Sequence, residues 1–335
     1  MTTSIERADT DSARNEQPGK PGVMRLLHKY PWVPGLVLAV LLVAFFSWQL
    51  PDTYPTWENL RSVIDQQVGL LVLALGVTIV LLIGEFDLSF SSTIGLSGAV
   101  GILSMTAMGW PTGVAILAAI AVGVIVGLLN GLAVTYGRAP AFIATLAIGF
   151  IATGVERLLT DDKTISEGVT STYTDLTLER TLGFPLSTWL ALALVVVVGV
   201  ALGYTTYGRR VRATGMNRTA VRLAGISVPT VRISAFVILG LFAGIVGVFL
   251  TSQGGSSFPN SGTGLLLPPY AAVFLGAALV GRGRFSVLAT VYGVFFIAAL
   301  ETGLVMMNKP GAVIQLIEGG VLIAAVILAR QEQKV

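Results

Sequence analysis

Long apolar runs separated by short polar breaks recur along nearly the whole chain. The pattern predicts ten helical segments, at 33–50, 63–84, 90–108, 112–135, 141–159, 187–205, 233–252, 268–281, 285–306 and 312–330. Most are close to the roughly 20 residues that an α-helix needs to cross the hydrocarbon core of a bilayer. Gly, Pro, Asn or Asp mark the breaks between them. The sequence therefore predicts an all-α, polytopic transmembrane bundle of about ten spans.

Two segments depart from a simple spanning helix. Segment 268–281 would measure roughly 21 Å, against a hydrocarbon core of about 30 Å. Segment 63–84 runs into EFDLSFSS with almost no loop before the next helix. Short or interrupted helices are tolerated where protein or a water-filled cavity covers the backbone, and in transporters they often mark the pathway. We therefore expect short or broken helices inside the bundle.

The composition supports this fold class and excludes several kinds of chemistry. The 335 residues are 54% hydrophobic and only 12% charged, whereas a soluble protein is about 25% charged. The chain has no cysteine, and its one histidine, His28, lies outside the apolar segments. Disulfides, thiolate or histidine metal sites and Ser-His catalysis are therefore excluded, and we expect neither a catalytic residue nor a metal site.

The distribution of basic residues predicts the orientation of the bundle. If the N-terminus is cytoplasmic, 16 of the 21 Lys and Arg residues fall on the inside and five on the outside, as the positive-inside rule requires. Both termini are then cytoplasmic. Residues 1–23 read as a disordered tail and residues 24–335 as one transmembrane domain, with a cytoplasmic loop at 206–232 and extracytoplasmic loops at 160–186 and 253–267.

One cytoplasmic segment, 208–232, carries six arginines and no acid. Asn217 suits the N-cap of a short helix, and Gly225 suits the position just after its end. Val221 and Ala224 would share one face of that helix, while arginines lie on another. The arginines could simply fix topology and contact anionic lipid, but a capped helix indicates more order than this requires. A docking surface for a cytoplasmic partner explains that order.

Acids near or inside the apolar segments are the other candidates for function. Asp87 could cap the helix that starts near residue 90 or face a cavity, and Glu85, which has no capping role, could face water. Glu301 and Glu318 lie inside apolar helices at similar depth in the outer half, where they could pair with a hydroxyl or an arginine, or line a path for a hydrophilic solute. The candidates for a translocation pathway are Asp65, Gln66, Gln67, Glu85, Asp87, Ser89, Asn130, Glu301, Gln315 and Glu318.

Four motifs, in this order, resemble the inner-membrane permease subunits of ATP-binding-cassette (ABC) importers of the ribose/xylose/galactose type. They are ALGVTIVLLIGEFDLSFSSTIGLSGA at 74–99, FIATLAIGFIATGVERLLT at 142–160, YGRRVRATGMNRTAVRLAGISVPTVR at 207–232 and LGAALVGRGRFSVLATVYG at 275–293. The similarity covers roughly 57–330. The chain departs from the family's pattern at five positions that are typically glycine: Glu85, Ser91, Ala277, Arg282 and Phe285.

The resemblance implies a multi-pass permease of the bacterial plasma membrane that imports a sugar or similar small polar solute. It implies a homodimer or heterodimer of permease chains, a cytoplasmic ABC ATPase and an extracytoplasmic solute-binding protein. This chain has no GxxxxGK[ST] phosphate loop, so ATP and Mg²⁺ would be cofactors of the partner ATPase and not of this chain. The segment that couples to the ATPase would comprise Gly215, Asn217, Arg218, Ala220, Val221, Arg222, Leu223, Ala224, Gly225 and Ile226.

Two kinds of alternative remain open at the level of sequence. An ion-coupled secondary transporter would use the intramembrane acids and need no ATPase. Within the importer class, the solute could instead be a signalling furanone, a nucleoside or a branched-chain amino acid. An enzyme is not expected, since no nucleophile–base pair is present, and the position of the basic residues points to lipid and topology, not to nucleic acid.

Overall fold

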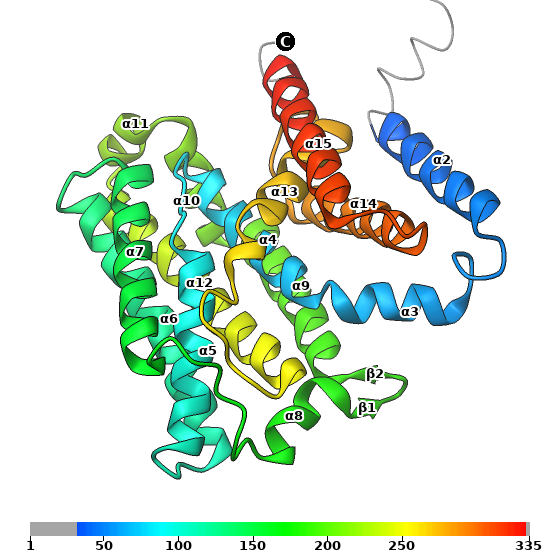
Figure 1. Cartoon of the computed structure of the whole chain (residues 1–335). Helices are drawn as coiled ribbons and strands as arrows, with labels where there is room; N and C mark the ends of the chain where they lie inside the picture. Colours follow the sequence, from blue (N-terminus) through cyan, green and yellow to red (C-terminus); the bar gives the residue numbers. More distant parts are fainter. Residues whose placement is uncertain (1–31, 333–335) are drawn as a thin grey trace, which may run out of the picture.

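The computed structural model describes residues 32–332 (Figure 1), so the predicted tail at 1–23 lies outside the described residues. The regular secondary structure of this range is helical, apart from one two-stranded hairpin, β1 (Arg180–Thr181) with β2 (Phe184–Pro185), and an isolated β-bridge between Ile165 and Ser257. The longer helices are α2 (Val33–Gln49), α4 (Val68–Leu82), α5 (Phe90–Thr106), α6 (Thr112–Thr135), α7 (Ala141–Thr160), α9 (Leu186–Tyr204), α12 (Val228–Gly254), α13 (Leu267–Leu279), α14 (Val287–Met306) and α15 (Gly311–Glu332). The shorter ones are α3 (Trp57–Gln66), α8 (Ser171–Leu178), α10 (Thr206–Met216), α11 (Arg218–Leu223) and the 3₁₀ turn η1 (Thr263–Leu265).

Each of the ten predicted segments coincides with one of the longer helices. Within the described residues, six helices (α6, α7, α9, α12, α14 and α15) are long and apolar enough to cross a membrane. The pair α3–α4 would make a seventh span if its two bent parts are counted together, and α2, α5 and α13 are shorter apolar helices. The helical membrane-protein class is thus confirmed, while a count of ten spans remains a prediction.

Two helix boundaries differ from the prediction for local reasons. The segment expected at 63–84 is divided at Gln67, where α3 and α4 meet at 49°. Helix α12 begins at Val228, five residues earlier than predicted, because the Ser227 side chain accepts a hydrogen bond from the Thr230 N–H. Pro229 then lies in the first turn, where its missing N–H costs nothing.

Helices α4 and α12 lie at the centre of the bundle. Helix α4 is buried almost along its entire length, and it packs against α12, α13, α14 and α9. Helices α6 and α12 cross so closely that a Cβ on Gly123 would meet the carbonyl oxygen of Gly240, and a Cβ on Gly240 would meet that of Gly123. Small residues allow this backbone-to-backbone approach inside membranes.

The two ends of the bundle carry different structures. In Figure 1, α11 and the C-terminal end of α15 lie at the top, whereas α8 and the hairpin lie at the bottom. Tyr173 fastens α8 to α12, because its ring is fully buried and its hydroxyl donates to the Val248 carbonyl oxygen at 3.3 Å. Burial raises the pKa of Tyr173 to about 12, so the hydroxyl keeps its proton at neutral pH.

Candidate functional site

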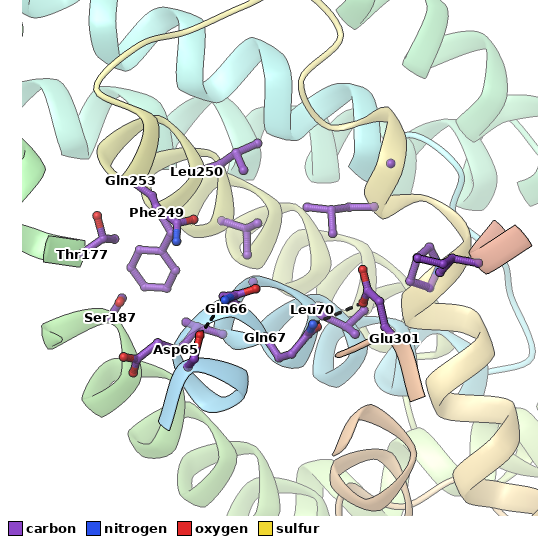
Figure 2. A pocket seen from close by; sticks show the side chains of 18 of the residues that line it. Asp65, Gln66, Gln67, Leu70, Thr177, Ser187, Phe249, Leu250, Gln253 and Glu301 are labelled. Atoms are coloured by element: carbon purple, nitrogen blue, oxygen red, sulfur yellow. Dashed lines mark hydrogen bonds between the residues drawn. The ribbon is translucent and has the colours of Figure 1, made fainter. Parts of the chain in front are cut away.

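A cavity of about 790 Å³ lies at the end of the bundle that the charge pattern places outside the cell (Figure 2). Its walls come from the α3–α4 bend, α8, the last turns of α12, the start of α13, and the facing ends of α14 and α15. Six of the ten pathway candidates line it: Asp65, Gln66, Gln67, Glu301, Gln315 and Glu318. These residues are distant in sequence and come together only in the folded bundle.

Hydrogen bonds hold several of these side chains in place. Gln67 donates from Nε2 to Glu301 Oε2 at 3.3 Å, which joins the α3–α4 bend to α14 (Figure 2). Asp65 forms an ion pair with Arg180 at 3.2 Å and accepts a hydrogen bond from the Thr188 hydroxyl at 3.1 Å. Of the two alternatives left open for Glu301, the structure shows it at the cavity wall, and its hydrogen-bond partner is an amide, not a hydroxyl or an arginine.

Among the described residues, the cavity is lined by more acidic than basic side chains. Three carboxylates line it, those of Asp65, Glu301 and Glu318, and a single guanidinium, that of Arg180, which is bound to Asp65. Carboxylates only accept hydrogen bonds when ionised, so this lining is suited to a solute rich in hydroxyl or other donor groups. The same acidic lining disfavours the entry of an anion.

Other polar residues complete the wall without having been candidates. They are Ser62, Thr177, Arg180, Ser187 and Gln253. Thr177 lies in α8 and Arg180 in the β1–β2 hairpin. The sequence of this region is short and polar, and it has no apolar periodicity from which its position over the cavity could be predicted. Gln253 could have been found, because it is a polar residue in the last turn of an apolar helix.

Glu85 is away from the cavity, at the opposite end of α4. It is only 8% exposed, and its Oε1 accepts hydrogen bonds from Arg218 at 2.7 Å and from Arg232 at 2.6 Å. Glu85 therefore does not face water, which was the alternative left open for it, and it does not line the cavity although it was a pathway candidate. A buried carboxylate needs such partners to remain charged.

Asp87, Ser89 and Asn130 form a second buried cluster that also does not line the cavity. Asp87 Oδ1 accepts hydrogen bonds from the backbone N–H and the hydroxyl of Ser89, both at 2.7 Å, in the turn before α5. The N-cap residue of α5 is Ser89 and no side chain caps the helix, so Asp87 does not take the expected capping position. Asn130 Nδ2 donates to Ser89 Oγ at 2.5 Å. The Tyr270 hydroxyl donates to the Asp87 carbonyl oxygen at 2.6 Å, which connects α13 to the same turn.

The arginine-rich segment folds as two consecutive helices, α10 and α11. The Asn217 side chain accepts a hydrogen bond from the Ala220 N–H at 3.0 Å, as expected for an N-cap, and Gly225 has φ +75° just after the end of the helix. Val221 is buried and Ile226 is half-buried, while Ala220, Arg222, Leu223 and Ala224 are exposed. Val221 and Ala224, which were expected to share one face, therefore differ in burial, because α11 ends at Leu223 and the helical spacing no longer applies.

Gly215 is required by the packing of this segment on the bundle. A Cβ at this position would overlap the Leu82 carbonyl oxygen, at the last residue of α4. No larger residue fits without moving α10 away from α4. The segment thus lies directly against the end of α4 that the charge pattern places inside the cell.

The residues that depart from the family's glycines do not line the cavity. Phe285 packs edge-on against Phe274 with ring centroids 5.4 Å apart, and Ala277 is fully buried. Arg282 has φ +53°, a conformation that favours glycine. These side chains therefore do not narrow the cavity.

One buried acid was missed by the sequence reading. Glu156, in α7, is 1% exposed, and its Oε1 accepts a hydrogen bond from the Asn260 N–H at 3.1 Å. It thereby anchors the loop between α12 and α13, part of which lines the cavity. An acid within an apolar run was the available signal, but its neighbour Arg157 suggests a helix end exposed to water.

Comparisons with known proteins agree with the resemblance noted in the sequence. A family model described as the permease component of the branched-chain amino acid transport system matches residues 60–326. The ribose import permease protein RbsC of Escherichia coli K12 is 30% identical over 302 residues, which cover 89% of this chain and 93% of that protein. The autoinducer 2 import system permease protein LsrC of Salmonella typhimurium is 31% identical over 291 residues, covering 87% and 83%.

A solved structure, PsaBC from Streptococcus pneumoniae in complex with Fab, covers 87% of this chain with a TM-score of 0.47 and 13% identity. The family model spans most of the chain, and relatives at about 30% identity span nearly all of it. The chain therefore belongs to the permease family of bacterial ABC importers, as a multi-pass protein of the inner membrane.

Proposed function

We propose that this chain forms the translocation pathway of an ATP-driven importer that carries a sugar or a similar small, polar, uncharged solute into the cell. The observation that supports this most is the cavity of about 790 Å³, which gathers six of the predicted polar residues at the ends of helices predicted to face outwards. Its carboxylates and amides can accept hydrogen bonds from sugar hydroxyls. The excess of acid argues against solutes that carry a carboxylate of their own, branched-chain amino acids included.

The proposed arrangement of partners follows from the two ends of the bundle. A solute-binding protein would deliver its cargo to the outer cavity, and a cytoplasmic ATPase would dock on α10 and α11. Met216 and Leu223 are 86% and 85% exposed on that segment, which is expected of apolar residues that a protein partner covers. We also propose that two permease chains assemble and that both termini are cytoplasmic.

The experiment that tests this function is gentle solubilisation from the native membrane, followed by mass spectrometry of the proteins that co-purify. We expect a stoichiometric partner that carries a GxxxxGK[ST] loop. Reconstituted vesicles should then take up D-ribose, autoinducer-2 or a related solute only with internal ATP. Uptake without an ATPase that stops when a proton or sodium gradient is dissipated would contradict the proposal and favour an ion-coupled carrier.

Neutralising the two acids on α14 and α15 tests the cavity as the pathway. Glu301→Gln and Glu318→Gln should each lower the initial rate of uptake about tenfold, because a hydrogen bond to a charged group contributes about 1.5 kcal/mol or more. Both proteins should reach the membrane in normal amount. Glu167→Gln, at an exposed position in the loop after α7, is the matched control, and normal uptake by both cavity variants would assign them a structural role.

Charge reversal on α11 tests the docking surface. The side chain of Arg222 is exposed, and Arg222→Glu should weaken ATPase binding about fivefold to tenfold by placing an acid in the interface. Reversal of Arg218 is a poorer test, since it would place a second carboxylate against the buried Glu85. The measurement is the amount of ATPase retained by the purified permease; full retention by Arg222→Glu would remove this residue from the interface.

A further inference from the structure

The ion pairs of Glu85 join three parts of the chain. Arg218 is the first residue of α11, Arg232 lies in the second turn of α12, and Glu85 follows α4. One carboxylate oxygen accepts from both guanidinium groups, at 2.7 and 2.6 Å. The Glu85 side chain is 9% exposed and that of Arg232 is 16% exposed, so the pair is shielded from water and weakly screened by salt.

The same contacts fix the arginine-rich segment to the inner end of α4. The Arg218 guanidinium also donates to the Ile83 carbonyl oxygen at 3.0 Å. Gly215 lies against the Leu82 carbonyl oxygen, one residue earlier. Three positions at the end of α4 are thus in contact with α10 or α11, and the strongest of these contacts are charge-assisted hydrogen bonds.

The other end of α4 belongs to the cavity. Val68, Gly69 and Leu70 line it, and the 15 residues of the helix place its two ends about 21 Å apart. Because α4 is enclosed by other helices along its length, a displacement of its inner end is transmitted along it and is not absorbed by solvent-exposed turns. A second connection between the two ends runs through Asp87, whose carbonyl oxygen accepts a hydrogen bond from the Tyr270 hydroxyl on α13. Tyr270 is two residues from Pro268, which lines the cavity.

We propose that Glu85 is a positioning residue that couples the ATPase to the cavity, by holding α11 to the inner end of α4 through Arg218 and to α12 through Arg232. The inference rests on the proposed function. Glu85 contacts neither solute nor ATPase; it determines whether movement of the docking segment reaches the α3–α4 bend. Without its charge, the segment can move while α4 remains in place.

The test follows the cavity directly, so it does not require the solute to be known. The chain contains no cysteine, so Gln66→Cys places a single thiol at an exposed cavity residue beside the bend. The permease is purified with its ATPase and placed in nanodiscs. The rate of labelling by fluorescein maleimide is measured without nucleotide and with ATP plus vanadate. We expect nucleotide to change this rate several-fold in the Gln66→Cys protein.

Adding Glu85→Gln should reduce that nucleotide-dependent change to within about 20% of no change, while the ATPase stays bound and hydrolyses ATP. Arg218→Gln should reduce the nucleotide response in the same way, with bound ATPase measured in the same preparation. The double variant should be no worse than Glu85→Gln alone, since both substitutions remove the Glu85–Arg218 interaction. Arg218→Gln leaves Glu85 paired with Arg232, so it tests the inference even if Glu85→Gln impairs folding. Glu167→Gln is the control and should leave the response intact.

The outcomes separate the two proposals. A full nucleotide response in Arg218→Gln, or effects of the two substitutions that add, would overturn the role of Glu85 while leaving the importer assignment in place. If the Gln66→Cys permease carries no ATPase, or if its labelling rate does not change with ATP, the proposed function itself is contradicted, and the role of Glu85 with it.

Discussion

Gly240→Leu is expected to lower both the yield of folded permease and its melting temperature. A Cβ at Gly240 would overlap the Gly123 carbonyl oxygen and would lie 2.9 Å from the Gly127 Cα, so the obstruction is backbone and cannot rotate away. Helices with ordinary side chains pack 8–10 Å apart, and a leucine would force α6 and α12 towards that spacing. Overpacking of a tight contact usually costs about 1–3 kcal/mol, and we expect the upper end of that range or more here, because every helix packed on α12 must shift.

The measurement is thermal unfolding of the purified protein in detergent, together with its elution profile in size-exclusion chromatography. Gly154→Leu is the matched control, since Gly154 also lies within an apolar helix but has no atom within 4 Å of the position that a Cβ would take. It should unfold at the wild-type temperature or slightly above, because leucine has the higher helix propensity. Equal melting temperatures for the two variants would show that α6 and α12 do not cross at Gly240.

The positions of the helices and of their caps depend on local information in the chain. The ten apolar segments were predictable for a physical reason. In a membrane, each helix must satisfy its backbone polar groups with its own hydrogen bonds, and its side chains must be apolar over the length that lipid or other helices surround. The cap at Asn217 and the left-handed conformation of Gly225 were also predictable, since both depend only on near neighbours in the chain. The bend at Gln67 was not, because the residues around it form good helices on both sides.

The polar residues show the limit of this reasoning. Six pathway candidates do share a cavity, since acids and amides in apolar helices usually face the protein interior. Glu85 was misjudged because its partners lie 133 and 147 residues further along the chain, and no local pattern indicates that two arginines will enclose it. Arg180 was missed for a similar reason, because its ion pair with Asp65 depends on how the hairpin folds over the cavity.

Leu223→Asp is expected to remove the ATPase from the purified complex almost entirely. Leu223 is 85% exposed at the end of α11, and Met216, at the end of α10, is 86% exposed. A leucine covered by a partner contributes about 1.5–3 kcal/mol, and an aspartate in its place would bury an unpaired charge at further cost. The sum exceeds about 3 kcal/mol, so the affinity for the ATPase should fall at least about a hundredfold.

A matched control exists on the opposite side of the bundle. Leu182 is 86% exposed at the turn of the β1–β2 hairpin, and its φ of +52° is a conformation that aspartate tolerates better than leucine does. Leu182→Asp should therefore leave both the melting temperature of the permease and the bound ATPase unchanged. The dissociation constant of each variant for the isolated ATPase is the quantity to compare. If the Leu223→Asp and Leu182→Asp proteins bind the ATPase equally well, the exposed apolar residues of α10 and α11 do not form the docking surface. Those residues would then be assigned to contact with lipid.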